Sequence, residues 1–212
     1  DIALMRLTGA HMHFQHLSTA GSVELVRAAK AEGLPVTAEA TTHHFSLTDA
    51  ACATFDPVFK VHPPLRTDSD VTAVRQGLAD GTIDAIATDH APHTAHDKEH
   101  AFDLAPPGML GLETAFSVAL EDSGLDLPDI LAVMSWQPAI IAGLNDHQGV
   151  NVQPGAAANL CVIDPDATWT VSGQTMASRS ANTPYEGRTL RGRIRHTICA
   201  GEAVVVDGEA QR

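Results

Sequence analysis

The sequence is poor in basic residues and in long apolar runs, and each shortage excludes a class of protein. Its 212 residues carry 13 Lys and Arg against 26 Asp and Glu, a formal net charge of -13. A nucleic-acid partner is not expected, because phosphate binding needs a basic face. No segment approaches the roughly 18 uninterrupted apolar residues of a membrane-spanning helix, and residues 1–3 do not open a signal peptide. The sequence therefore predicts no membrane partner either.

Cysteine and aromatic residues are also scarce, whereas histidine is abundant. Cys52, Cys161 and Cys199 are odd in number and far apart, which fits neither a disulfide framework nor a closely spaced zinc knuckle. We therefore expect a reducing, cytoplasmic location. The apolar fraction of 44% with 18% charged residues is typical of a folded globular chain. The 12 histidines suit metal binding or proton transfer near neutral pH.

Strand-like and helix-like patterns alternate in the first part of the chain. Periodicity predicts strands over residues 10–18, 35–40 and 83–88, and helices over 20–32 and 68–80 that end at Gly33 and Gly81. Strands that alternate with helices favour an α/β fold with a parallel sheet. In such a fold the chemistry lies at the carboxyl ends of the strands.

The rest of the chain changes character twice. Residues 90–111 form a long polar stretch that we expect to be a binding loop or lid. Helices are predicted over 112–123, 126–134 and 138–144, and short β segments over 158–163, 168–171, 194–199 and 203–206. We therefore expect two domains, an α/β part over residues 1–148 and an all-β part over 149–212.

Four candidate features lie just past predicted strands or in the loops beyond them. They are His16, the pair His43 and His44, the segment 60–66 (KVHPPLR) and the segment 88–93 (TDHAPH). A carboxylate and imidazoles at one sheet edge can bind a divalent ion that activates water, and Asp89 could itself be a general acid or base. Taken singly, His16 also suits a packing role, and Asp89 with His90 also suits a turn.

Taken together, these segments resemble the dihydroorotases of the amidohydrolase superfamily, in order and spacing as well as in residues. The matching segments are 14–19 (FQHLST), 36–44 (VTAEATTHH), 60–66, 80–93 (DGTIDAIATDHAPH), 106–108 with 111–116 (PPG and GLETAF) and 182–187 (NTPYEG). The resemblance runs from Ile2 to the C-terminus. It implies the C-terminal part of a (β/α)₈ TIM-type barrel, holding strands 6–8, followed by part of a β-sandwich domain.

The resemblance also implies roles for particular residues. His16, at the end of the sixth strand, corresponds to a zinc ligand. Asp89, at the end of the eighth, corresponds to the residue that contacts the metal and handles the proton of the attacking water. His93 corresponds to a position that helps to bind the substrate carboxylate. The backbone of Pro106, Pro107 and Gly108 corresponds to the segment that closes over the pyrimidine ring.

The sequence departs from the family pattern in two ways. His62 stands where the family usually has a substrate-binding asparagine, which puts ring recognition there in question. The first-strand His-x-His pair with its arginine, the fourth-strand ligand and the fifth-strand histidine have no counterparts. We therefore expect this chain alone to be inactive and to need the missing N-terminal half, since zinc normally takes three or four protein ligands.

The activity that the resemblance implies is the interconversion of N-carbamoyl-L-aspartate and L-dihydroorotate in de novo pyrimidine (UMP) synthesis, with one or two zinc ions (Zn2+) per complete site. Two alternatives remain open. One is another cyclic amidohydrolase, such as a hydantoinase, dihydropyrimidinase or allantoinase. The other is a non-catalytic relative that serves as a scaffold for aspartate transcarbamoylase, with which some dihydroorotases associate. Open strand edges also predict a homo-oligomer or pairing with the missing half.

Overall fold

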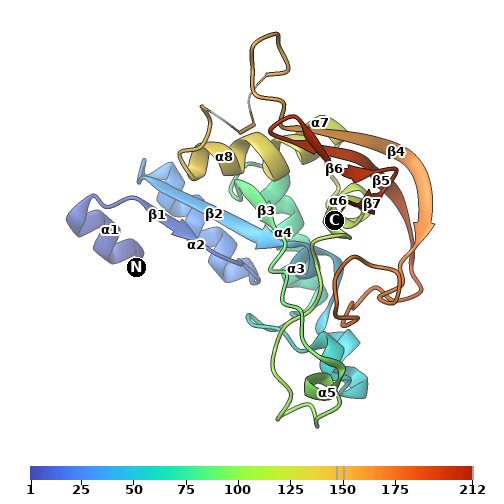
Figure 1. Cartoon of the computed structure of the whole chain (residues 1–212). Coiled ribbons are helices and arrows are strands. Elements are labelled where there is room, and N and C mark those ends of the chain that lie inside the picture. The colour runs from blue at the N-terminus through green and yellow to red at the C-terminus, as the bar shows by residue number, and fades with distance from the viewer. Residues whose placement is uncertain (147, 150, 212) are drawn as a thin grey trace.

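The first part of the chain forms a parallel sheet of three strands. A computed structural model describes residues 1–146, 148–149 and 151–211 (Figure 1). The strands β1 (Met12–Phe14), β2 (Val36–Thr41) and β3 (Ala85–Ala87) lie in the order β1-β2-β3. Met12 pairs with Val36, and Glu39 pairs with Ala85, both in parallel register. Because all three strands point the same way, their carboxyl ends meet at one edge of the sheet.

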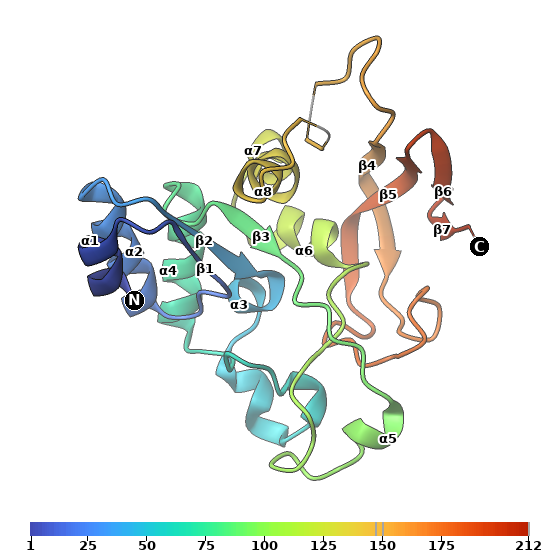
Figure 2. The ribbon, with the colours of Figure 1, turned by 60° about the vertical axis from the view of Figure 1, so that its left-hand side comes forward.

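The crossover helices α2 (Ala20–Ala31) and α4 (Asp68–Ala79) cover this sheet, and they contact each other (Figures 1 and 2). The Thr19 hydroxyl caps α2 by accepting a hydrogen bond from the Ser22 amide. Val23, Val26 and Ala29 recur at helical spacing and form the buried stripe of α2. The strand, helix, strand order that periodicity predicts is thus confirmed. A further helix, α1 (Ile2–Thr8), precedes β1 and was not predicted.

The helices that follow β2 and β3 along the chain, apart from α4, are mostly short. They are α3 (Thr42–Ser46), the 3₁₀ helices η1 (Asp49–Thr54) and η2 (Pro57–Phe59), and α5 (Ala95–Lys98), which lies within the long loop. Next come α6 (Ala115–Asp122), α7 (Leu127–Leu131), the π-helical η3 (Ala132–Trp136) and α8 (Gln137–Ile141). The two helices predicted over 126–134 and 138–144 are one continuous helical stretch, which a π turn carries from α7 into α8.

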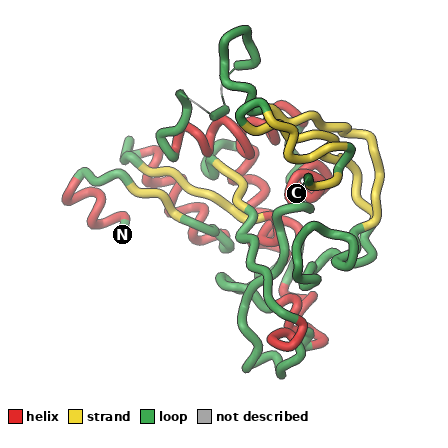
Figure 3. The backbone as a smooth tube through the Cα atoms, in the orientation of Figure 1, coloured by secondary structure: helices red, strands yellow, loops and turns green. Residues whose placement is uncertain are grey.

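The last part of the chain forms an antiparallel sheet, β4 (Leu160–Thr170), β5 (Thr189–Cys199), β6 (Glu202–Val206) and β7 (Glu209–Ala210), in chain order (Figure 3). The segments predicted as two strands, 158–163 and 168–171, belong to one long strand. Its register with β5 shifts between Asp164 and Thr168. There the Asp164 carboxylate accepts hydrogen bonds from the Asp166 and Ala167 amides, which builds a local turn inside the strand.

Both sheets share one hydrophobic core. Val171 and Leu190, from the β4–β5 region, are fully buried in the same cluster as Val74 and Val118. The Ser117 hydroxyl of α6 donates to the Gly192 carbonyl of β5 at 2.6 Å. The domain boundary that we expect between residues 148 and 149 stays a prediction. The residues on either side of this pair, His147 and Val150, lie outside the described residues. Among the described residues, no helix has the length and apolarity to cross a membrane.

Gly111 packs closely against the backbone of Thr88, just after β3. A Cβ atom at Gly111 would overlap the backbone carbonyl oxygen of Thr88, which cannot move away as a flexible side chain could. We expect Gly111→Ala to destabilise the fold by about 1–3 kcal/mol, because overpacking forces a backbone shift. The control is Gly21→Ala in α2, where a Cβ meets no atom within 4 Å. It should be neutral or stabilising by up to about 1 kcal/mol. Urea unfolding of both variants measures the difference.

Candidate active site

Polar side chains gather where the three parallel strands end. His16 lies two residues after β1, Asp89 two residues after β3, and His43 and His44 lie in α3, directly after β2. The backbones of His16 and Asp89 have φ angles of 56° and 44°. This left-handed region is uncommon for residues other than glycine, and it concentrates at functional sites. The fold thus brings together residues that are 73 positions apart in the sequence.

Three of these side chains, His16, His43 and Asp89, form a compact group with Glu39 of β2. We call this group of four the strand-end cluster. The Asp89 carboxylate lies between two imidazoles: His16 Nε2 is 3.7 Å from Oδ1, and His43 Nε2 is 3.9 Å from Oδ2. On its other side, His16 Nδ1 is 2.9 Å from Glu39 Oε1, although the two atoms are not aligned as a hydrogen bond. The short separation keeps the His16 ring close to the Glu39 carboxylate.

Glu39 is the member of the cluster that the sequence analysis did not predict. Besides His16, it contacts His13, whose Nε2 lies 3.1 Å from Glu39 Oε2. Burial favours the neutral acid, but the His16 and His13 imidazoles outweigh burial and hold the pKa of Glu39 below its usual range. In turn, the Glu39 carboxylate is the main reason why the pKa of His16 is raised. The sequence feature that could have indicated Glu39 is its place in the alternating pattern of β2, where it is a polar residue between the buried Ala38 and Ala40.

Asp89 has the opposite electrostatic setting. Burial raises its pKa, and the nearby Glu39 carboxylate adds to this, while His16 works against it. A carboxyl group whose pKa moves toward neutrality can both accept and release a proton in one reaction cycle. The arrangement therefore suits Asp89 to general acid and base chemistry.

The two histidines of α3 differ in their partners. His44 is held on both sides: its Nδ1 lies 2.6 Å from the Thr41 hydroxyl, and its Nε2 lies 2.9 Å from the Pro63 carbonyl oxygen. Because a carbonyl can only accept, Nε2 carries the proton. Burial lowers the pKa of His44 to about 4. Burial, together with His44 and His16, also places the pKa of His43 well below its usual value, and among the described residues His43 Nε2 has no hydrogen-bond partner.

These residues fit part of a metal site. His16 and Asp89 offer an imidazole nitrogen and a carboxylate, two of the donor types that zinc prefers. They face each other across a gap too long for a hydrogen bond. Within residues 1–146, 148–149 and 151–211, however, no group of three or more His, Cys, Asp or Glu side chains is arranged to hold an ion. Of the four side chains in the cluster, His16 and Asp89 are thus the pair that could contribute donors to an ion.

The structure brings His93 and the 106–108 segment together. His93 Nε2 lies 3.0 Å from the Pro107 carbonyl oxygen, so this nitrogen carries the proton and donates it. The Gly108 amide donates to the Lys60 carbonyl at 2.8 Å. Gly108 has a φ of 137°, and a Cβ there would come within 2.6 Å of His93 Nε2. Only glycine therefore fits this position. His62 is exposed, and its contact with substrate stays a prediction.

Lys98 holds the same loop from its outer side. Its ammonium donates to the Pro106 carbonyl at 2.9 Å and to the Pro57 carbonyl at 3.0 Å. Burial, with help from the positive charge of Lys60, lowers the pKa of Lys98 to about 8.

The lowered pKa of Lys98 predicts an unusual amine. Acylation of Lys98 by acetic anhydride should rise with pH and level off above about 8, because the neutral amine is the nucleophile. An ordinary lysine, with a pKa near 10.5, should still be rising there. Peptide mass spectrometry across pH 6–10 measures the profile, and Lys98→Arg is the control that removes the signal. A profile that keeps rising to pH 10 would contradict the prediction.

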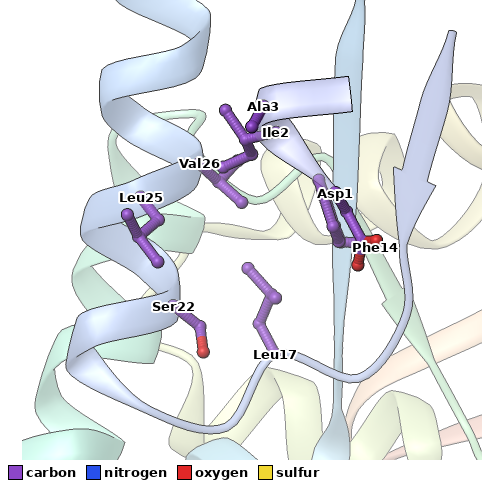
Figure 4. Close-up of a pocket in the computed structure, with 8 residues that line it drawn as sticks. All are labelled: Asp1, Ile2, Ala3, Phe14, Leu17, Ser22, Leu25 and Val26. Carbon is purple, nitrogen blue, oxygen red and sulfur yellow. The ribbon is translucent and has the colours of Figure 1, made fainter. Parts of the chain in front are cut away.

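A separate apolar cavity of about 340 Å³ lies between α1, the end of β1 and α2 (Figure 4). Its walls include Phe14, Leu17, Leu25 and Val26. Within the described part of the chain, Asp1 is the one ionisable residue that lines it. The cavity therefore lacks the groups that hydrolytic chemistry needs, and the strand-end cluster is the candidate active site.

Comparison with known proteins identifies the family. Residues 2–204 match the family model described as "Amidohydrolase family". A dihydroorotase from Mycobacterium tuberculosis is 50% identical over 213 residues, which cover 99% of this chain and 49% of that protein. A dihydroorotase from Streptomyces coelicolor is 50% identical over 213 residues, covering 99% of this chain and 50% of that protein.

Solved structures give the same result for the fold. The L-hydantoinase (dihydropyrimidinase) from Arthrobacter aurescens superposes with a TM-score of 0.91 at 28% identity, covering 100% of this chain and 48% of that one. The chain thus spans about half the length of the relatives it matches. Its fold is part of a TIM-type barrel followed by β structure, as the sequence resemblance implied. With the family model covering nearly the whole chain, this protein belongs to the amidohydrolase family.

Proposed function

We propose that this chain is the C-terminal half of a dihydroorotase, which interconverts N-carbamoyl-L-aspartate and L-dihydroorotate. The observation that carries the proposal is the 50% identity with dihydroorotases over 99% of the chain. The match extends over nearly the whole chain, in which both the strand-end cluster and the loop around His93 lie. The reaction is hydrolysis of a cyclic amide and its reverse, and it belongs to pyrimidine synthesis.

In this proposal, His16 and Asp89 hold zinc together with ligands from outside the chain. Bound zinc would polarise the ring carbonyl and make a water molecule acidic enough to ionise near neutral pH. Asp89 accepts the proton of the attacking water on its carboxylate and returns it to the amide nitrogen that leaves the carbonyl carbon. Glu39 holds the His16 ring in place through its contact with Nδ1.

Substrate contacts are proposed for the loop beyond Asp89. His93 would help to bind the substrate carboxylate, and the backbone of Pro106, Pro107 and Gly108 would close over the ring. The hydrogen bond from His93 to the Pro107 carbonyl supports this assignment, because it places both parts of the loop at one position. His62 would face the substrate from the segment between α3 and α4.

The wider assignments are also proposals. Residues 1–148 would be the barrel portion and 149–212 the sandwich portion, which the parallel and antiparallel sheets support. A cytoplasmic location and one or two zinc ions per site follow from the likeness to dihydroorotases. Among the described residues, β1 and β3 are the edge strands of the parallel sheet, which supports association with the missing half or with further copies. Association with aspartate transcarbamoylase rests on family likeness alone.

A second candidate is hydrolysis of another cyclic amide. The solved structures similar to this chain include hydantoinases, which supports turnover of hydantoin or dihydropyrimidine rings. The higher identity with dihydroorotases favours the first proposal. Parallel assays with L-dihydroorotate, hydantoin and allantoin separate the two.

The deciding experiment measures hydrolysis of L-dihydroorotate by this chain with added zinc, alone and with the N-terminal half supplied as a separate polypeptide. We expect activity only in the mixture. Zinc should likewise bind tightly only in the mixture, and metal analysis after gel filtration measures this binding. Silence of a correctly associated mixture would contradict the proposal and favour a non-catalytic relative. The first residue to change would then be His62, by His62→Asn.

A further inference from the structure

Asn182 reaches the candidate active site from a distant part of the chain. It lies in the connection between β4 and β5, after Thr170 and before Thr189, and it is buried. This connection passes beside the loop that follows β3, as the contacts of Asn182 establish (Figure 2). Asn182 is therefore a link between the antiparallel sheet and the loop that holds His93.

That loop has two arms, residues 90–93 and residues 106–110, which pair with each other. The Ala91 amide donates to the Met109 carbonyl at 2.9 Å, and His90 and Met109 form an isolated parallel bridge. The first arm carries His93 and the second carries Gly108. Within the described part of the chain, this short pairing and the His93–Pro107 hydrogen bond connect the arms directly, and the Gly111 amide, just past the second arm, donates to His90 Nδ1 at 3.3 Å.

The side-chain amide of Asn182 bonds to both arms at once. Its Nδ2 donates to the Ala91 carbonyl at 3.1 Å and to the Gly108 carbonyl at 3.3 Å. Its Oδ1 accepts from the His93 amide at 3.2 Å. The orientation of the amide is settled by its partners, since two carbonyl oxygens face the nitrogen and one N–H faces the oxygen. The Asn182 backbone carbonyl also accepts from the Leu110 amide at 3.0 Å.

Packing cannot replace these bonds on the outer side of the loop. A cavity of about 230 Å³ lies there, and its walls include His93, Lys98 and Asn182. Where side chains leave such a space, the relative position of two backbone segments depends on hydrogen bonds. On this side of the loop, Asn182 is therefore the side chain that connects the His93 backbone to the Gly108 carbonyl.

We propose that Asn182 is a positioning residue for the substrate loop: it fixes the His93 arm against the Gly108 arm and so sets the gap that receives the substrate carboxylate and ring. The inference rests on the proposed function for the identity of the substrate. The position of the arms does not depend on it. The Asn182 side chain bonds to Ala91, His93 and Gly108 rather than to His16 or Asp89, so its effect falls on binding rather than on proton transfer.

The test compares hydrogen exchange in the complete protein with Asn182→Asp and with a matched control. The aspartate keeps the size and the acceptor for the His93 amide but loses both donors. Amides of residues 90–93 and 108–110 should exchange about tenfold faster or more, while the β4–β5 ladder stays unchanged. The control is Ser117→Ala, which removes a buried hydrogen bond elsewhere, between helix α6 and strand β5. It should leave both arms protected.

Two further readouts complete the test. Asn182→Ser introduces no charge, keeps one acceptor and one donor in its hydroxyl, and should give intermediate exchange rates. In the assembled enzyme, Asn182→Asp should raise KM for L-dihydroorotate about tenfold with kcat within about threefold of native. Exchange in both arms within about twofold of native, or acceleration spread equally over the whole protein, would overturn the inference. Absence of dihydroorotase activity in the native protein would refute the proposed function instead.

Discussion

Asp89→Asn is expected to lower the hydrolysis of L-dihydroorotate by the assembled enzyme by a factor of about 10²–10⁴. This is the contribution that a positioned general acid or base makes, and asparagine has the same shape but cannot exchange a proton at neutral pH. The expected loss is in kcat, because Asp89 is proposed to act on the attacking water and the leaving nitrogen. Steady-state kinetics at saturating substrate measure it.

The control for this experiment is Asp68→Asn, an exposed carboxylate in the first turn of α4, which should leave kcat unchanged. Zinc content must be measured alongside, since Asp89 is also a proposed ligand. Full zinc content with a large loss of kcat assigns the loss to proton transfer. Retention of more than about one tenth of native kcat would contradict the assigned role, because it lies outside the range for such a residue.

Sequence periodicity located β2, α2 and α4 closely, because the spacing of their apolar residues is a local pattern. It made β1 (Met12–Phe14) and β3 (Ala85–Ala87) longer than they are and missed α1. Val23, Val26 and Ala29 repeat at helical spacing and are all buried in α2. The grouping of His16 and Asp89 also followed from sequence, since carboxyl ends of neighbouring parallel strands share one edge. The Asp89–His16 separation of 3.7 Å agrees with that expectation.

What sequence patterns missed depends on contacts between distant segments. Strand β5 begins at Thr189, five residues before the predicted start, although Arg191 and Gly192 weaken any strand pattern. Pairing with β4 and the hydrogen bond from Ser117 to Gly192 hold that part of the strand. Asn182 lies 89 residues from His93, and no local pattern reports such a contact. The left-handed backbones of His16 and Asp89 are likewise imposed by the surrounding fold.

Lowering the pH from 7 to 4 is expected to remove about 3 kcal/mol of stability through His44 alone, because one pKa unit corresponds to about 1.4 kcal/mol. An unfolded histidine has a pKa of 6.5, whereas burial lowers the pKa of His44 to about 4 in the folded chain. Between these values the unfolded state binds more protons. The free energy of unfolding is therefore highest above pH 6.5 and falls as the pH drops toward 4. The buried His43 acts in the same direction.

His44→Gln isolates this contribution, because glutamine can still donate to the Pro63 carbonyl but does not titrate. It should be less stable than the native protein at pH 7, since the bond from Thr41 to Nδ1 is lost. The difference in free energy of unfolding between the two proteins should then shift by about 3 kcal/mol in favour of the variant as the pH falls to 4. Urea unfolding at both pH values measures the difference, and His11→Gln at an exposed position is the control. A difference that stays constant with pH would show that His44 has the same pKa in the folded and unfolded chains. It would contradict the inference that His44 is a neutral ring held by two hydrogen bonds next to the strand-end cluster.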